Sequence, residues 1–243
     1  VTVPSIEDIF RRLELLLHCA QVALLNQCLP QTDTFLKATI SLIPDVPTHE
    51  EIDYKRVSTE ARLATFLRSF LSFLVVVPGH PTHGPFYLIQ GLLNAMPRYE
   101  WTPETGHRTA VYIDMLPLLC AYSQRKLPYS VERVESNDVL YGGSNDYMEE
   151  LQEHKATVMQ EVISQLTELR ESQDRAVKIR QAELVLQLVN QLIMTYKLDT
   201  AVTSFVIKLM ELAKKSKDIL PKKDLMLLES TTEILAMQPG TSA

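Results

Sequence analysis

Apolar residues recur at three- and four-residue steps along most of the chain, and prolines interrupt this pattern at intervals. The first run covers residues 6–25 and stops before Pro30, and later runs stop at Pro44 and at the segment 78–81. This spacing is typical of helices that each bury one face. It predicts about nine helices joined by mostly short turns, with no convincing strand, and the polar segment 49–55 is expected to be a longer loop.

Helix ends can be predicted from the residues that cap them. Ser5, followed three residues later by Asp8, is a capping-box arrangement for the first helix, and the second is expected over residues 34–43. Asp199 and Pro221 stand where an N-cap and a proline at the first helical position belong. The last turns of the third helix are apolar on all sides, so this part is expected to be central and buried.

Glycine is scarce, with 7 residues among 243, which leaves little material for phosphate-binding loops or tight β-hairpins. The helices pair along the chain at roughly 40 residues per hairpin, a length typical of helical repeats. We therefore predict an all-α fold, a HEAT-like α-solenoid of stacked antiparallel helical hairpins over residues 1–236, with a flexible tail at 237–243. A single compact bundle is the structural alternative.

Charge and hydropathy exclude several functional classes. The net charge is −6 and no long run of Lys or Arg occurs, so a nucleic-acid partner is not expected. The longest apolar run, residues 70–78, is about half a membrane span, so no membrane-spanning helix is expected. Cys19, Cys28 and Cys120 have no metal-type spacing and are expected to be buried, reduced thiols in a cytoplasmic protein. The chain has no initiator Met and no signal peptide, so we expect it to be a segment of a longer protein.

Motifs for catalysis are missing from the sequence. His80 and His83 are close enough to suggest a metal pair, but Pro81 prevents a regular helix between them and no third ligand is near. A proline-fixed turn is the simpler interpretation. The P-loop, GxSxG and HExxH patterns are absent, so we expect no enzyme, no metal and no cofactor.

The segment 127–145 is the largest irregular region, and it is rich in aromatic and aliphatic residues. A loop of this kind between long helices suits an interface anchor, although it could equally cover its own core. Its candidate partner-binding residues are Tyr129, Val134, Asn137, Asp138, Leu140 and Tyr141.

Three motifs occur in order: SLIPDVP at 41–47, VVVPGHPTHG at 75–84 followed by PFYLIQGLLNAM, and VESNDVLYGG at 134–143. Together they resemble the C-terminal part of the large α-solenoid subunit of retromer, and more closely that of its paralogue in the retriever complex. The retromer subunit has acidic residues where Gly79 and Thr82 stand. The later helices are similar in layout more than in residues.

The resemblance implies a non-catalytic scaffold of an endosomal cargo-recycling complex, peripheral to endosomes. Its C-terminal solenoid would cradle a small subunit of metallophosphoesterase fold, near the tyrosine-diglycine loop. An arrestin-like subunit would bind the missing N-terminal part, and cargo adaptors and a regulatory complex would join the full assembly. Two other hypotheses are a helical adaptor that binds short peptide motifs and a metal-dependent hydrolase that uses His80 and His83.

Overall fold

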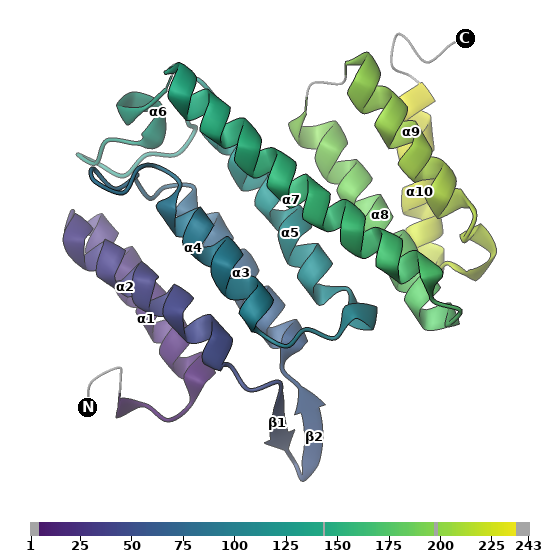
Figure 1. Cartoon of the computed structure of the whole chain (residues 1–243), viewed down its shortest axis with the longest axis horizontal. Coiled ribbons are helices and arrows are strands. Elements are labelled where there is room, and N and C mark those ends of the chain that lie inside the picture. Colours follow the sequence, from purple (N-terminus) through teal and green to yellow (C-terminus); the bar gives the residue numbers. More distant parts are fainter. Residues whose placement is uncertain (1–4, 143, 197–198, 237–243) are drawn as a thin grey trace. The chain divides into compact units, whose positions relative to one another are not determined.

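The computed structural model describes residues 5–142, 144–196 and 199–236, and within them the chain forms ten α-helices and one short β-hairpin (Figure 1). The predicted all-α, solenoid-like fold class is confirmed. The helices are α1 (Ile9–Leu25), α2 (Leu29–Leu42), α3 (Glu60–Leu74), α4 (Tyr87–Ala95), α5 (His107–Tyr122), α6 (Asn137–Leu140), α7 (Asn145–Glu171), α8 (Arg175–Thr195), α9 (Thr200–Lys214) and α10 (Lys222–Ala236).

Contacts divide the chain into two compact units. Unit 1 comprises Val1–Trp101 and Leu118–Ala156, and unit 2 comprises Thr102–Pro117 and Thr157–Ala243. Helices α5 and α7 therefore contribute to both units. In α5 the division follows Pro117, which lies inside the helix and cannot donate a backbone hydrogen bond. That residues 1–236 form one continuous solenoid segment stays a prediction. The predicted tail at 237–243 lies outside the described residues.

The core of unit 1 forms between its first four helices. Helix α2 packs against α1 and α4, and α1 also contacts α3. Leu13, Leu36, Leu67 and Leu92 come from these four helices and are fully buried. Each full burial of such a side chain contributes about 1.5–3 kcal/mol, so the three- and four-residue apolar spacing determines which helix faces meet.

Unit 2 is organised around α8, which contacts both α9 and α10. Leu184, Val185 and Leu188 of α8 are fully buried, as is Val206 of α9. A buried amide belongs to this packing: Gln181 donates to the carbonyl oxygen of Leu166 over 2.7 Å. Because the amide has a partner, its burial does not carry the cost of an unpaired polar group.

Three predicted helix starts need correction and one is confirmed. Pro221, expected at the first helical position, lies directly before α10, which begins at Lys222. Asp8, not Ser5, caps α1, and its carboxylate accepts the N–H groups of Phe10 and Arg11 at 2.9 and 3.2 Å. Helix α2 begins at Leu29, because Pro30 falls in the first turn, where its missing N–H costs nothing. Asp199 does cap α9, accepting the N–H of Val202 over 2.8 Å.

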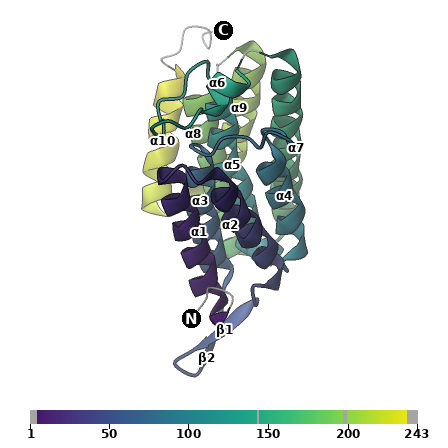
Figure 2. The same ribbon diagram turned by 90° about the vertical axis from the view of Figure 1, so that its left-hand side faces the viewer.

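The segment expected to be a polar loop is a β-hairpin instead. Strand β1 (His49–Ile52) pairs antiparallel with β2 (Lys55–Ser58), and Figure 2 shows the hairpin extending beyond the helix ends of unit 1. Its two turn residues, Asp53 and Tyr54, have φ values of 52° and 60°. A two-residue turn of this kind usually contains glycine, which explains why the sequence does not indicate it.

Two burial predictions also need correction. Cys120 is buried, but Cys19 is half-buried and Cys28 is exposed, since it lies in the turn before α2. At the end of α3, Leu74 is buried but Val75 and Val76 are only half-buried, because the helix stops at Leu74 and the chain turns away.

Candidate partner-binding surface

Two segments of unit 1 meet at one end of its helices: the proline-histidine turn, residues 77–84, and the loop between α5 and α7. The link is Asn137, the first residue of α6, which is 2 % exposed. Its Oδ1 accepts the N–H of Gly79 over 2.6 Å, and its Nδ2 donates to the carbonyl oxygen of Val77 over 3.4 Å. The buried amide of Asn137 thus links the loop to two residues that lie 58 and 60 positions earlier in the sequence.

Position 79, where the two segments meet, has no room for a side chain, so it requires glycine. A Cβ on Gly79 would lie 2.6 Å from Cα of Pro85 and 2.8 Å from Cε2 of Tyr141. The Tyr141 hydroxyl also donates to the carbonyl oxygen of His80 over a long 3.5 Å. The tyrosine of the tyrosine-diglycine motif therefore covers the turn, and a larger residue at position 79 would displace it.

A cluster of stacked aromatic rings packs against the loop. The rings of Tyr141 and Tyr147 stack with centroids 5.9 Å apart, and Tyr147 stacks on Phe86 at 4.9 Å. The Tyr147 hydroxyl donates to the carbonyl oxygen of Tyr122, and the Tyr122 hydroxyl donates to that of Leu74, over 3.0 and 2.8 Å. Burial raises the pKa of both Tyr122 and Tyr147, because their ionised forms would be desolvated.

Asp138 closes the loop on itself. Its Oδ2 accepts the N–H of Leu127 over 3.1 Å, and its Oδ1 accepts the Ser136 hydroxyl. The Ser136 hydrogen bond lowers the pKa of the Asp138 carboxyl below its usual value. Gly142 completes the turn, since a Cβ there would collide with the carbonyl oxygen of Asp138.

The predicted partner-binding residues thus fall into two groups. Tyr129 and Leu140 are 59 % and 42 % exposed and present apolar surface to solvent. Val134 and Tyr141 are half-buried. The polar side-chain atoms of Asn137 and Asp138 form hydrogen bonds that hold the loop together.

Val139 was not among the predicted partner-binding residues, yet it is 66 % exposed. It lies beside Leu140 in α6, so the two residues together form an exposed aliphatic pair. The hydrophobic composition of the loop was the signal that could have identified it.

The histidine pair has a structural role in the turn. Nδ1 of His80 accepts the N–H groups of Thr82 and His83 at 3.1 and 3.2 Å, and the two imidazole rings lie 4.4 Å apart. No group of three or more potential metal ligands occurs among the residues that the structure describes. The geometry therefore supports the proline-fixed turn.

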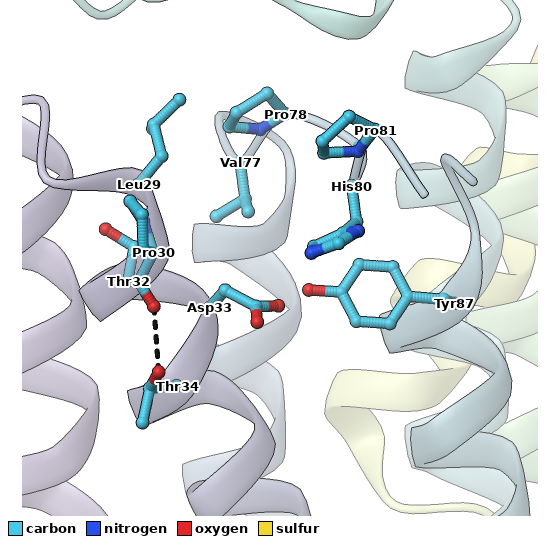
Figure 3. A pocket seen from close by; sticks show the side chains of 11 residues that line it. Leu29, Pro30, Thr32, Asp33, Thr34, Val77, Pro78, His80, Pro81 and Tyr87 are labelled. Carbon is cyan, nitrogen blue, oxygen red and sulfur yellow. Dashed lines mark hydrogen bonds between the residues drawn. The ribbon is translucent and has the colours of Figure 1, made fainter. Parts of the chain in front are cut away.

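A cavity of about 500 Å³ opens beside this turn, between the first turns of α2 and residues 77–81 (Figure 3). Its walls are largely apolar: Leu29, Pro30, Val77, Pro78 and Pro81 line it. The polar side chains Asp33, His80 and Tyr87 point toward one another at its base. Sequence reasoning missed this site, because Asp33 lies about 50 positions from the other two.

Comparison with known proteins identifies the family. Residues 1–240 match the model of the VPS35L C-terminal domain. A human protein named VPS35 endosomal protein-sorting factor-like is 42 % identical over 193 residues, covering 79 % of this chain and 20 % of the relative. Those of Danio rerio and Drosophila melanogaster are 43 % and 30 % identical over 188 and 240 residues, which cover 77 % and 98 % of this chain and 19 % and 25 % of the relatives.

The chain thus spans about a fifth to a quarter of the length of these relatives. No helix in the part of the chain that the structure describes is long and apolar enough to cross a bilayer. The resemblance indicated by the three sequence motifs is confirmed: the chain belongs to the VPS35L C-terminal domain family.

Proposed function

We propose that this chain is the C-terminal scaffold region of a large subunit in an endosomal cargo-recycling complex of the retriever or retromer type. It holds a small folded subunit of metallophosphoesterase fold and does not itself catalyse a reaction. The names of its relatives, endosomal protein-sorting factors, support the endosomal and non-enzymatic parts of this proposal.

The observation that carries the binding role is the loop between α5 and α7. Asn137, Asp138 and Tyr141 hold its backbone in one conformation, so little conformational entropy is lost when a partner binds. The same loop exposes the aliphatic pair Val139 and Leu140, and Tyr129 lies 59 % exposed nearby in sequence. A pre-organised loop with exposed aromatic and aliphatic side chains is typical of an interface anchor.

The remaining partners belong to the longer protein. The arrestin-like subunit would bind an N-terminal part outside this chain, and cargo adaptors and the regulatory complex would act on the full assembly. Membrane association would then be indirect, through the assembly rather than through these helices.

Co-purification with the small subunit tests the proposal. Leu140→Asp places a charge in the centre of the proposed contact, and loss of such an anchor typically costs 2 kcal/mol or more, about 30-fold in affinity. Ile163→Asp is a matched control, since Ile163 is also 42 % exposed but lies on α7 in unit 2. Equal retention of the partner by both variants would remove the loop from the interface. Tyr141→Asp is less clean, because Tyr141 also packs inside the aromatic cluster.

The adaptor hypothesis remains as an alternative, and the cavity beside the turn is the feature that favours it. It predicts binding of short peptides without any folded subunit. A pull-down with this chain as bait separates the two, because a scaffold retains one small folded protein in equimolar amount.

A further inference from the structure

The cavity between α2 and the proline-histidine turn has one acidic group, and neither lysine nor arginine is among the residues that line it; His80 supplies one imidazole. Eleven residues line the cavity, and Asp33 is the only carboxylate among them. Its volume of about 500 Å³ falls within the range of about 300–1,000 Å³ that is usual for ligand sites. Three prolines in the wall restrict the backbone, so the cavity exists before a ligand arrives.

The Asp33 carboxylate is only half satisfied. Its Oδ2 pairs with Nζ of Lys37 over 2.8 Å, one helical turn further along α2. Its Oδ1 is enclosed and accepts no hydrogen bond from the part of the chain that the structure describes. An enclosed carboxylate oxygen without a donor is unfavourable, so a ligand that supplies a donor would be favoured.

Aromatic rings complete the base of the cavity. The rings of His80 and Tyr87 meet edge to face with centroids 5.4 Å apart, and both are directed toward Asp33 (Figure 3). Nζ of Lys37 lies 5.3 Å from the centroid of the Tyr87 ring, at the distance of a cation–π contact. The protein's own ammonium group therefore already occupies one side of a carboxylate-and-ring arrangement that attracts cations.

His80 presents only one nitrogen to a ligand. Its Nδ1 accepts two backbone N–H groups, so the neutral ring carries its hydrogen on Nε2. A nitrogen held in this way is unavailable to a metal ion, and a single carboxylate beside it is too small a ligand set. The chemistry of the cavity consequently favours an organic cation.

We propose that this cavity binds an arginine side chain presented by an extended segment of a partner protein. The planar guanidinium stacks on the ring of Tyr87 and donates to Oδ1 of Asp33, while Lys37 stays on Oδ2. Because Oδ1 is enclosed in this structure, binding requires the Asp33 side chain to turn toward the cavity, with the flexible Lys37 side chain following Oδ2. The apolar walls, Leu29, Val77 and the prolines, cover the methylene groups of the arginine and the residues that flank it.

Small probes test this on the 243-residue chain by NMR, with the aromatic rings isotopically labelled. N-acetyl-arginine amide should shift the His80 and Tyr87 ring signals in a saturable way. The citrulline analogue, which keeps the shape but loses the charge, and the norleucine analogue should bind at least about ten-fold more weakly, the equivalent of about 1.4 kcal/mol. Equal binding of all three probes would show an apolar cavity only, and no binding of arginine would also overturn the proposal.

A charge-removing variant adds a second criterion. Asp33→Asn should weaken arginine binding by at least about ten-fold. Glu183→Gln is the matched control, because Glu183 also forms a helical ion pair, with Arg180 at 3.0 Å, but lies in unit 2. Unchanged binding by Asp33→Asn contradicts the assignment. If that variant does not fold, the probe series on the unmodified chain decides alone. The result is independent of the endosomal role, since it requires no partner subunit.

Discussion

Asn137 provides the most direct test of how the loop is held. Replacing it by Ala removes the acceptor of the Gly79 N–H and the donor to the Val77 carbonyl in a side chain that is 2 % exposed. Each buried group left without a partner costs about 1–3 kcal/mol. The bond to Gly79 is short at 2.6 Å and carries most of the effect, whereas the bond to Val77 is long at 3.4 Å. Gly79 is itself half-buried, so water can replace part of the loss.

We therefore expect Asn137→Ala to lower the free energy of unfolding by about 2 kcal/mol, which is roughly a 30-fold change in the unfolding equilibrium. Urea unfolding followed by far-ultraviolet circular dichroism measures this value. Asn94→Ala is the matched control, because Asn94 is exposed on α4, where alanine is the better helix former. Amide exchange at Gly79 should accelerate in Asn137→Ala alone.

The outcome that refutes this reasoning is a loss below about 0.5 kcal/mol relative to Asn94→Ala, which is the range of ordinary surface substitutions. In that case the two segments would be held by the aromatic cluster and not by the amide. Asn137→Ala should also weaken partner binding, because the loop would no longer be pre-organised.

Three further predictions concern the loop, the hairpin and alkaline pH. Gly142→Ala should destabilise the chain by about 1–3 kcal/mol in urea unfolding, since its Cβ meets the Asp138 carbonyl, and an unchanged midpoint would contradict that contact. Tyr54→Gly relieves a positive φ at a 98 % exposed position and should slow amide exchange across β1 and β2; faster exchange would show that the tyrosine side chain matters more. Burial raises the pKa of Tyr122 and Tyr147. Their contribution to the free energy of unfolding is therefore fully present below a pH of about 10 and is lost as the pH rises further. Tyr147→Phe should make that fall less steep, and an identical pH profile would argue against the shift at Tyr147.

The fold class could be predicted because helix formation depends on near neighbours. Apolar residues three and four apart place Leu13 or Leu36 on one face of their helix through local geometry alone, and that face is the one that is buried. The cap at Asp199 was equally local, since its carboxylate reaches an N–H three residues away. Errors arose where two local signals competed, as at Pro30, which both ends one helix pattern and begins the next helix.

The candidate site was predictable only in part. The composition of the segment 127–145 indicated a surface loop, and Tyr129 and Leu140 are exposed as an anchor requires. Composition could not show that Asn137 points inward, because its partners Val77 and Gly79 are about 60 residues earlier. The same limit applies to the hairpin, whose turn at Asp53 and Tyr54 contains no glycine.

The sequence by itself determined that this chain is helical, where most of its helices lie, and, through three ordered motifs, the family to which it belongs. The tertiary structure decided which polar side chains hold the fold and which remain free to bind. Asn137 and Asp138 belong to the first group, whereas one oxygen of Asp33 accepts no hydrogen bond from the residues that the structure describes. The physical reason is range: helix periodicity acts over four residues, whereas a hydrogen bond between a turn and a loop depends on where packing brings distant segments together.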